Sequence, residues 1–152
     1  MHGVLKSFQK KVKINPRLDT KSLSILILTI ITLNQLVSYK IHLNSGSYFC
    51  NKGIAFGLIM PKQLWLIWFL VLLGLIYFLF NNYQKNKGNL FIFLYTGIFF
   101  SGIVSNLLDR LIHSCIIDYF SILSLPLFNL PDIEIFSGLL LIIFVFIVNK
   151  DK

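Results

Sequence analysis

Long apolar runs alternate with short polar segments along most of this chain. The four runs, rich in Leu, Ile, Val and Phe, are approximately Ser22–Tyr39, Leu64–Phe80, Leu90–Leu108 and Ile133–Val148. Each is near the roughly 17–20 residues that an α-helix needs to cross a hydrocarbon core about 30 Å thick. The pattern therefore predicts an all-α membrane protein with four transmembrane helices.

A basic, polar segment precedes the first apolar run. Its charged part is long, and no small-residue cleavage site follows the run, so we do not expect a cleavable signal peptide. We expect a basic cytoplasmic arm at residues 1–21 and a single four-helix domain at residues 22–152.

The distribution of Lys and Arg predicts the orientation of the helices. Ten of the 14 basic residues lie in segments 1–21, 81–89 and 149–152, and the other four are Lys40, Lys52, Lys62 and Arg110. Cytoplasmic segments of membrane proteins carry an excess of Lys and Arg. We therefore expect both termini in the cytoplasm and the alternate segments on the outer side.

The composition excludes an ordinary soluble domain. The 152 residues are 56% hydrophobic and 13% charged, with a mean hydropathy of +0.77. A net charge of +8 is compatible with a nucleic-acid partner, but the basic residues flank the apolar runs, as they do in membrane proteins. We expect no nucleic-acid partner.

Carboxylates gather between the third and fourth apolar runs. Four of the six acidic residues lie within 26 positions: Asp109, Asp118, Asp132 and Glu134. A carboxylate in or near a membrane costs several kcal/mol unless it is paired or hydrated. The clustering therefore predicts a chemical function for this region, on the outer side.

Two lines of residues follow the predicted third helix. The first is the small-residue line that lets membrane helices approach closely, and consists of Gly97, Ser101 and Ser105. The second consists of Gly102, Asn106 and Asp109, with Arg110 beside it. For Asp109 and Arg110 the alternatives are a functional site and a helix end whose charges meet water or each other. Asn106, one turn deeper, favours a site, because an amide in a membrane requires a partner.

The outer segment 40–62 carries weaker signals. Tyr39, Ile41 and Leu43 alternate with polar residues, which predicts a short strand, and residues 44–47 resemble a turn. The stretch Asn51–Gly57 is too polar to span and too apolar for a solvated loop, so it is either a surface cap or part of a site. We expect a small extracytoplasmic β-like or loop subdomain between helices 1 and 2.

The cysteines and histidines suggest no metal site. Cys50 and Cys115 both fall in outer segments, where we expect two unrelated buried thiols and keep a disulfide as the alternative. His2, His42 and His113 lack the spacing of a zinc site and supply no partnered base for a Ser or Cys nucleophile. We expect neither metal nor cofactor.

The polar motifs occur in an order that closely resembles the bacterial lipoprotein signal peptidases (signal peptidase II). They are Asn51-x-Gly53-x-Ala-Phe-Gly, Asn106-x-x-Asp109-Arg110, Asp118 followed by an aromatic residue, and Phe-Asn129-x-x-Asp132. The resemblance covers nearly the whole chain after the basic arm. It implies an intramembrane aspartyl endopeptidase whose catalytic residues are Asp118 and Asp132, without a cofactor.

The resemblance also implies the substrate and the location. Family members remove signal peptides from prolipoproteins that carry a diacylglyceryl-modified Cys, at the outer face of the bacterial inner membrane, so membrane lipids are the other expected partner. The expected substrate-binding and supporting residues are Asn51, Gly53, Asn106, Asp109, Arg110 and Asn129. The alternative for these six is structural hydrogen bonding within the bundle.

Several positions depart from the family pattern. The family has Asp-Gln-x-x-Lys where this chain reads Asn34-Gln35-Leu-Val-Ser38. Other departures are Ser105 and Ser114 in place of glycines, Tyr119 in place of Phe, and Pro131 in place of a small residue. Both catalytic carboxylates remain, so we expect a working enzyme.

The chemistry of such a pair follows from electrostatics. Two carboxylates in one site cannot easily both ionise, so they share a proton. The ionised carboxylate takes a proton from the attacking water, and the protonated one helps to protonate the leaving amine. The alternatives are a small transporter or channel subunit and a non-catalytic assembly factor. Transporters usually place such acids near the bilayer midplane in repeated halves, whereas here the acids cluster at one interface and no repeat is visible.

Overall fold

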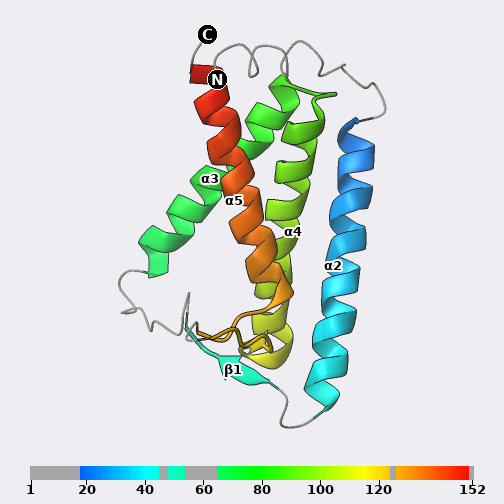
Figure 1. The fold of residues 1–152 in the computed structure, drawn as a ribbon, viewed down its shortest axis with the longest axis vertical. Helices are drawn as coiled ribbons and strands as arrows, with labels where there is room; N and C mark the ends of the chain where they lie inside the picture. Colours follow the sequence, from blue (N-terminus) through cyan, green and yellow to red (C-terminus); the bar gives the residue numbers. More distant parts are fainter. Residues whose placement is uncertain (1–17, 45–47, 54–64, 124–125, 151–152) are drawn as a thin grey trace.

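The computed structural model of the chain describes residues 18–44, 48–53, 65–123 and 126–150, and contains four long helices and a two-stranded sheet there (Figure 1). In chain order the elements are α2 (Thr20–Leu43), β1 (Phe49–Asn51), α3 (Trp65–Lys85), α4 (Leu90–His113), β2 (Ile116–Asp118) and α5 (Leu130–Lys150). Most of the predicted basic arm, residues 1–17, lies outside the described residues, as do residues 54–57 of the stretch Asn51–Gly57.

Each predicted apolar run forms a helix that extends beyond the run. Two of the helices, α2 and α4, are long and apolar enough by length and composition to cross a membrane. The strand predicted at residues 39–43 is wrong, because these residues form the last turns of α2. Tyr39 and Leu43 are exposed on the helix surface, so their alternation with polar residues does not mark a buried sheet face.

Helix α4 packs against α2 through the small-residue line predicted from the sequence. Hydrogen-bonded pairs between the two helices, Asn34 with Ser105 and Ser38 with Asp109, are both 71 residues apart. A constant offset means that the helices run parallel. A Cβ atom on Gly97 would lie 2.7 Å from Cδ2 of Leu26, so a larger residue there would require the Leu26 side chain to move.

Helix α5 packs on α4 equally closely. A Cβ atom on Gly102 would lie 2.6 Å from the backbone oxygen of Pro131, in the first turn of α5. Near the other end of the contact, a Cβ atom on Gly138 would lie 2.8 Å from the Cβ of Phe99. Close contact at Gly102 fixes the height at which α5 begins.

The apolar core lies at the end of the bundle away from the two strands. Leu79 and Tyr83 of α3 are fully buried there, Tyr95 of α4 is 1% exposed, and the amide of Asn82 donates a hydrogen bond to the Tyr95 hydroxyl. Toward the end that carries the strands, α3 lies apart from α4 (Figure 1). The helices therefore diverge beside the polar motifs.

The predicted β-like subdomain is present in a modified form. Strand β1 lies between α2 and α3 as predicted, but its antiparallel partner β2 comes from between α4 and α5, with Phe49 opposite Asp118 and Asn51 opposite Ile116. Helix α4 ends at Ser114, whose φ of 61° is left-handed, and the chain turns directly into β2. Such a conformation costs a non-glycine residue about 1–2 kcal/mol.

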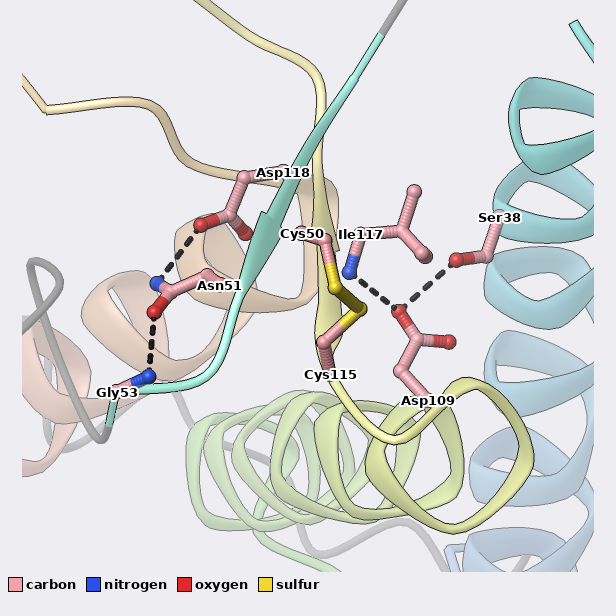
Figure 2. Close-up of a disulfide and its surroundings, with 8 residues drawn as sticks. All are labelled: Ser38, Cys50, Asn51, Gly53, Asp109, Cys115, Ile117 and Asp118. Carbon is pink, nitrogen blue, oxygen red and sulfur yellow. Dashed lines mark hydrogen bonds between the residues drawn. A yellow bond between two sulfur atoms is a disulfide. The ribbon is translucent and has the colours of Figure 1, made fainter. Parts of the chain in front are cut away.

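The expectation of two unrelated thiols is wrong. Cys50 and Cys115 form a disulfide with Cα atoms 5.4 Å apart, which closes a span of 65 residues (Figure 2). Strand pairing brings them together, because Cys50 lies opposite Ile117 and Cys115 immediately precedes β2. No local spacing in the sequence could indicate this contact.

The contact at Gly102 gives a test of the packing. Gly102→Ala should lower the free energy of unfolding by about 1–3 kcal/mol, because the Pro131 carbonyl must move. Gly74→Ala is the matched control, since a Cβ there meets nothing within 4 Å, and should be neutral or stabilising by up to about 1 kcal/mol. Thermal unfolding of the two purified variants in detergent measures the difference. Equal stabilities would contradict the close approach of α4 and α5.

Candidate active site

Asp118 ends strand β2 with its side chain 1% exposed. Its Oδ2 atom accepts a hydrogen bond from Nδ2 of Asn51 at 2.9 Å, and its Oδ1 atom accepts one from Nδ2 of Asn129 at 3.2 Å. Oδ1 of Asn51 in turn accepts the N–H of Gly53 at 2.8 Å (Figure 2). Both oxygens of this carboxylate are therefore held by side-chain amides.

Asp132 occupies the third position of α5, where its carboxylate takes part in the helix cap. Its Oδ2 atom accepts the backbone N–H of Asn129 at 3.2 Å, and Oδ1 of Asn129 accepts the N–H of Asp132 at 2.8 Å. This reciprocal pair is a capping box. Pro131 fits between them, because a residue in the first turn needs no intrahelical N–H partner. The hydroxyl of Tyr119 accepts the N–H of Leu130 at 3.2 Å.

A chain of amides joins the two carboxylates. Nδ2 of Asn106 donates to Oδ1 of Asp132 at 2.8 Å, and Oδ1 of Asn106 accepts from Nδ2 of Asn129 at 3.0 Å. Asn129, which also donates to Asp118, is thus the shared partner. The structure brings Asp118 and Asp132 into one hydrogen-bonded network although they are 14 residues apart in sequence.

The electrostatic setting of Asp118 disfavours its charge. The pKa of Asp118 is raised from 3.8 to about 6, mainly by burial and also by the nearby charges of Asp132 and Asp109. The hydrogen bond from Asn51 and the charge of Arg110 act in the opposite direction and lower this pKa. The group is consequently able to gain or lose a proton close to neutral pH.

Asp109 faces a different part of the molecule from the one its predicted line suggested. Its Oδ1 atom accepts from Nε2 of Gln35 at 3.1 Å, and its Oδ2 atom accepts from Oγ of Ser38 at 2.9 Å and from the N–H of Ile117 at 3.3 Å (Figure 2). Asp109 thus continues the line of Ser105 toward α2. Its contacts fix β2, and with it Asp118, against two helices.

Arg110 continues the second line instead, one turn after Asn106. Its Nη2 atom donates to the carbonyl oxygen of Gly53 at 2.8 Å, and its Nη1 atom donates to that of Asn106 at 3.4 Å. A line on one helix face advances here by four residues at each step, from Gly102 to Asn106 to Arg110. Arg110 therefore takes the place that the sequence analysis gave to Asp109. Arg110 connects the segment after β1 to α4.

A cavity of about 350 Å³ lies beside this network. Polar groups of Asn51, Asn106, Arg110 and Asp132 line one part of it. The rest of the lining is apolar and comes from the helices, strand β2 and the segment before α5: Leu72, Phe99, Ile103, Ile116, Leu127, Phe128, Ile135, Phe136 and Leu139. A carboxylate at the wall of an apolar cavity suits a polar bond within an otherwise apolar ligand. In the part of the chain that the structure describes, no group of three or more His, Cys, Asp or Glu side chains is placed to hold a metal ion.

Sequence reasoning did not assign a role to the polar residues of α2. Asn34, Gln35 and Ser38 lie at i, i+1 and i+4 in an otherwise apolar run, and the structure turns all three toward α4 or α5. Polar residues at this spacing in a membrane helix indicate one polar face. That signal was available in the sequence.

Comparison with known proteins identifies the family. The model of the family Signal peptidase (SPase) II matches residues 18–148. This chain belongs to the signal peptidase II family.

Relatives in the signal peptidase II family support the assignment. The chain is 34% identical over 97 residues to a lipoprotein signal peptidase of Halothermothrix orenii, covering 64% of this chain and 66% of that protein. It is 35% identical over 105 residues to the lipoprotein signal peptidase of Syntrophomonas wolfei, covering 68% and 69%. The chain is 31% identical over 114 residues to the lipoprotein signal peptidase of Clostridium tetani, covering 70% of each protein.

Solved structures share the fold of this signal peptidase II family member. A bacterial membrane enzyme determined at 2.3 Å by the in meso method superposes with a TM-score of 0.70 and 19% identity, covering 86% of this chain and 90% of that one. A second, at 1.9 Å, gives 0.67 and 20%, covering 84% and 93%.

The raised pKa of Asp118 gives a test that needs no substrate. Between pH values of about 4 and 6 the folded protein retains a proton that the unfolded chain releases, so this group's contribution to stability is complete below about pH 4 and is lost as the pH rises through about 6. Relative to the wild type, Asp118→Asn should therefore gain stability as the pH rises from about 4 to 7. Unfolding of both proteins across this range measures it. A pH-independent difference would contradict the raised pKa.

Proposed function

We propose that this protein is an intramembrane aspartyl endopeptidase that removes signal peptides from lipid-modified, diacylglyceryl-Cys prolipoproteins. The observation that carries the proposal is the pair Asp118 and Asp132, which the amides of Asn106 and Asn129 join beside an apolar cavity. Membership of a signal peptidase family supports the protease activity. The curated relatives are named lipoprotein signal peptidases, which supports the substrate class.

In the proposed reaction the two carboxylates share one proton. Asp118 is the better holder of that proton, because burial raises its pKa. Asp132, which lines the cavity, takes a proton from a water as the water oxygen attacks the peptide carbonyl carbon. The protonated carboxyl of Asp118 donates its proton to the carbonyl oxygen, which gives a gem-diol. When the C–N bond breaks, the leaving nitrogen takes a proton from the carboxyl pair and a hydroxyl of the gem-diol returns one to it, so the pair again holds a single proton. The pair titrates as a unit.

The proposed supporting residues act mainly on the carboxylates. Asn51 uses its Nδ2 atom on Asp118 and its Oδ1 atom on the N–H of Gly53, so we assign it the positioning of Asp118 rather than direct contact with substrate backbone. Asn106 and Asn129 set the separation of the pair. Asp109 and Arg110 hold β2 and the segment after β1 in place.

The apolar part of the cavity suits a signal peptide. Most of its lining side chains come from α3, α4 and α5, and α3 lies apart from α4 toward the end of the bundle that carries the strands (Figure 1). A hydrophobic segment that enters between the helices would place its peptide bond near Asp132 while its side chains stay in an apolar environment. Lipid chains on the modified Cys would remain in the bilayer.

The proposed location is the bacterial cytoplasmic membrane, with four spans, cytoplasmic termini and the active site at the outer face. The disulfide between Cys50 and Cys115 supports the orientation, because disulfides persist in oxidising compartments outside the cytoplasm. Both strands lie at the same end of the bundle as the disulfide, with Asp118 in β2 and Asp132 in the first turn of α5.

The proposed orientation predicts the behaviour of reporters. A reporter fused after Lys152 should behave as cytoplasmic, and one inserted near Asn44, at the end of α2, should be translocated. Alkaline phosphatase and green fluorescent protein fusions, which are active on opposite sides, measure this. Both reporters on one side would rule out the four-span arrangement, and a cytoplasmic reporter near Asn44 with a translocated one after Lys152 would rule out the proposed orientation.

The proposed carboxylate pair predicts the effect of amide substitutions. Asp118→Asn and Asp132→Asn should each abolish cleavage of a lipidated precursor, because an amide can neither accept nor deliver the proton. The double variant should lose little more than either single one, since residues that act as a unit are strongly non-additive. Asp109→Asn is the comparison and should retain residual activity, because Asp109 holds β2 and α2 in place through Ile117, Gln35 and Ser38.

Cleavage is measured by gel shift of the precursor at equal concentrations of folded protein. Turnover near the wild-type rate by either Asp118→Asn or Asp132→Asn would end the aspartyl assignment. Inhibition by a chelator or by a thiol-directed reagent would point to a different mechanism.

A further inference from the structure

A third carboxylate lies close to the pair but faces away from it. Glu134 follows Asp132 by two residues on α5, is absent from the cavity lining, and is directed at Asn34 of α2. Its Oε1 and Oε2 atoms each lie 3.0 Å from Nδ2 of Asn34, and the same nitrogen lies 3.0 Å from Oγ of Ser105. The proposed mechanism gives Glu134 no role.

The hydrogen-bond donors and acceptors around the side chain of Asn34 do not match in number. Its amide nitrogen has two hydrogens but faces three acceptor atoms. Its Oδ1 atom is buried and has no partner among the described residues, and the side chain is only 2% exposed. A buried acceptor without a donor costs about 1–3 kcal/mol. The site therefore lacks one donor, facing Oδ1.

Glu134 can supply that donor only in its neutral form, because an ionised carboxylate accepts hydrogen bonds and donates none. We infer that Glu134 is held as the neutral acid and donates its hydroxyl hydrogen to Oδ1 of Asn34, so that acid and amide form a two-point ring between α5 and α2. The carboxyl reaches this arrangement by turning about its last side-chain bond, a soft torsion. Nδ2 of Asn34 then donates one hydrogen to the other Glu134 oxygen and one to Ser105.

Among the described residues, only the amide of Asn34 donates to the Glu134 carboxyl and so favours its ionised form. Within hydrogen-bond distance, the described part of α2 presents the amide of Asn34, and α4 presents the hydroxyl of Ser105 beside that amide. The nearest titratable groups are Tyr119, in the segment after β2, and two acids, Asp132 on α5 itself and Asp109 on α4, whose charges act on Tyr119 together with that of Glu134. Asp132 would repel a second negative charge. An unpaired carboxylate inside a membrane costs several kcal/mol.

A neutral Glu134 makes this residue a positioning residue for the reaction, a role that rests on the proposed function. It ties the start of α5, which carries Asp132, to α2 at the level where Gly102 already fixes the height of that turn. It also adds no charge two residues from Asp132. The pair Asp118 and Asp132 can then hold its single shared proton without a third acid competing for it.

Glu134→Gln is the direct test, because a glutamine amide makes the same two-point ring without a titratable group. We expect Glu134→Gln to keep the wild-type melting temperature and turnover within about twofold, with a superimposable pH profile. Glu134→Leu removes the ring and should lower kcat by about ten- to a hundredfold through displacement of Asp132. The exchanged pair Asn34→Asp with Glu134→Gln keeps the ring with the acid on α2. Its turnover should therefore lack the loss expected for Glu134→Leu.

An infrared measurement tests the protonation state without any substrate. The spectrum of the wild type at pH 8 should contain a protonated-carboxyl band that Glu134→Gln lacks. Absence of that difference, or failure of Glu134→Gln to fold or to retain activity while the wild type cleaves, would overturn the inference. If the wild type does not cleave the lipidated precursor, the proposed function fails, whereas the infrared band and the melting temperatures still decide the state of Glu134.

Discussion

The need to surround buried carboxylates with donors governs the end of this molecule that carries the strands. Each oxygen of Asp109, Asp118 and Asp132 accepts at least one hydrogen bond. The donors are amides, a hydroxyl and backbone N–H groups rather than water. A charged group removed from water costs much unless such partners replace its hydration, so each acid depends on the elements that supply its donors.

Those donors come from parts of the chain that are far apart in sequence. Asp118 depends on β1 through Asn51 and on the residue that caps α5, Asn129. Asp109 depends on α2 through Gln35 and Ser38. The catalytic geometry therefore exists only when helices and strands are assembled together, and the close helix contacts at Gly97 and Gly102 serve the site as much as the core.

The sequence predicted much of the helical framework, because long apolar runs are a direct indication of membrane helices. It also predicted close packing along Gly97, Ser101 and Ser105, and motif order indicated the residues that the structure gathers around Asp118 and Asp132. The prediction of a strand at residues 39–43 was wrong. Apolar side chains that contact lipid are normally exposed, so their alternation with polar residues does not indicate a strand with one buried face. The disulfide depends on strand pairing, which no local spacing encodes, whereas Asp109 follows the four-residue repeat of Gly97, Ser101 and Ser105 toward α2.

The parallel pairing of α2 and α4 has a consequence for biosynthesis. Parallel neighbours in a membrane cannot be consecutive spans, so another helix, α3, has to cross back before α4 exists. The described partners of Asn34, Gln35 and Ser38 lie on α4 and α5, at least 70 residues later in the chain. A ribosome adding about 5–20 residues per second needs several seconds to supply them. During that interval the first helix stays in the bilayer with its polar face uncovered, so its Leu- and Ile-rich remainder has to hold it there until the bundle closes.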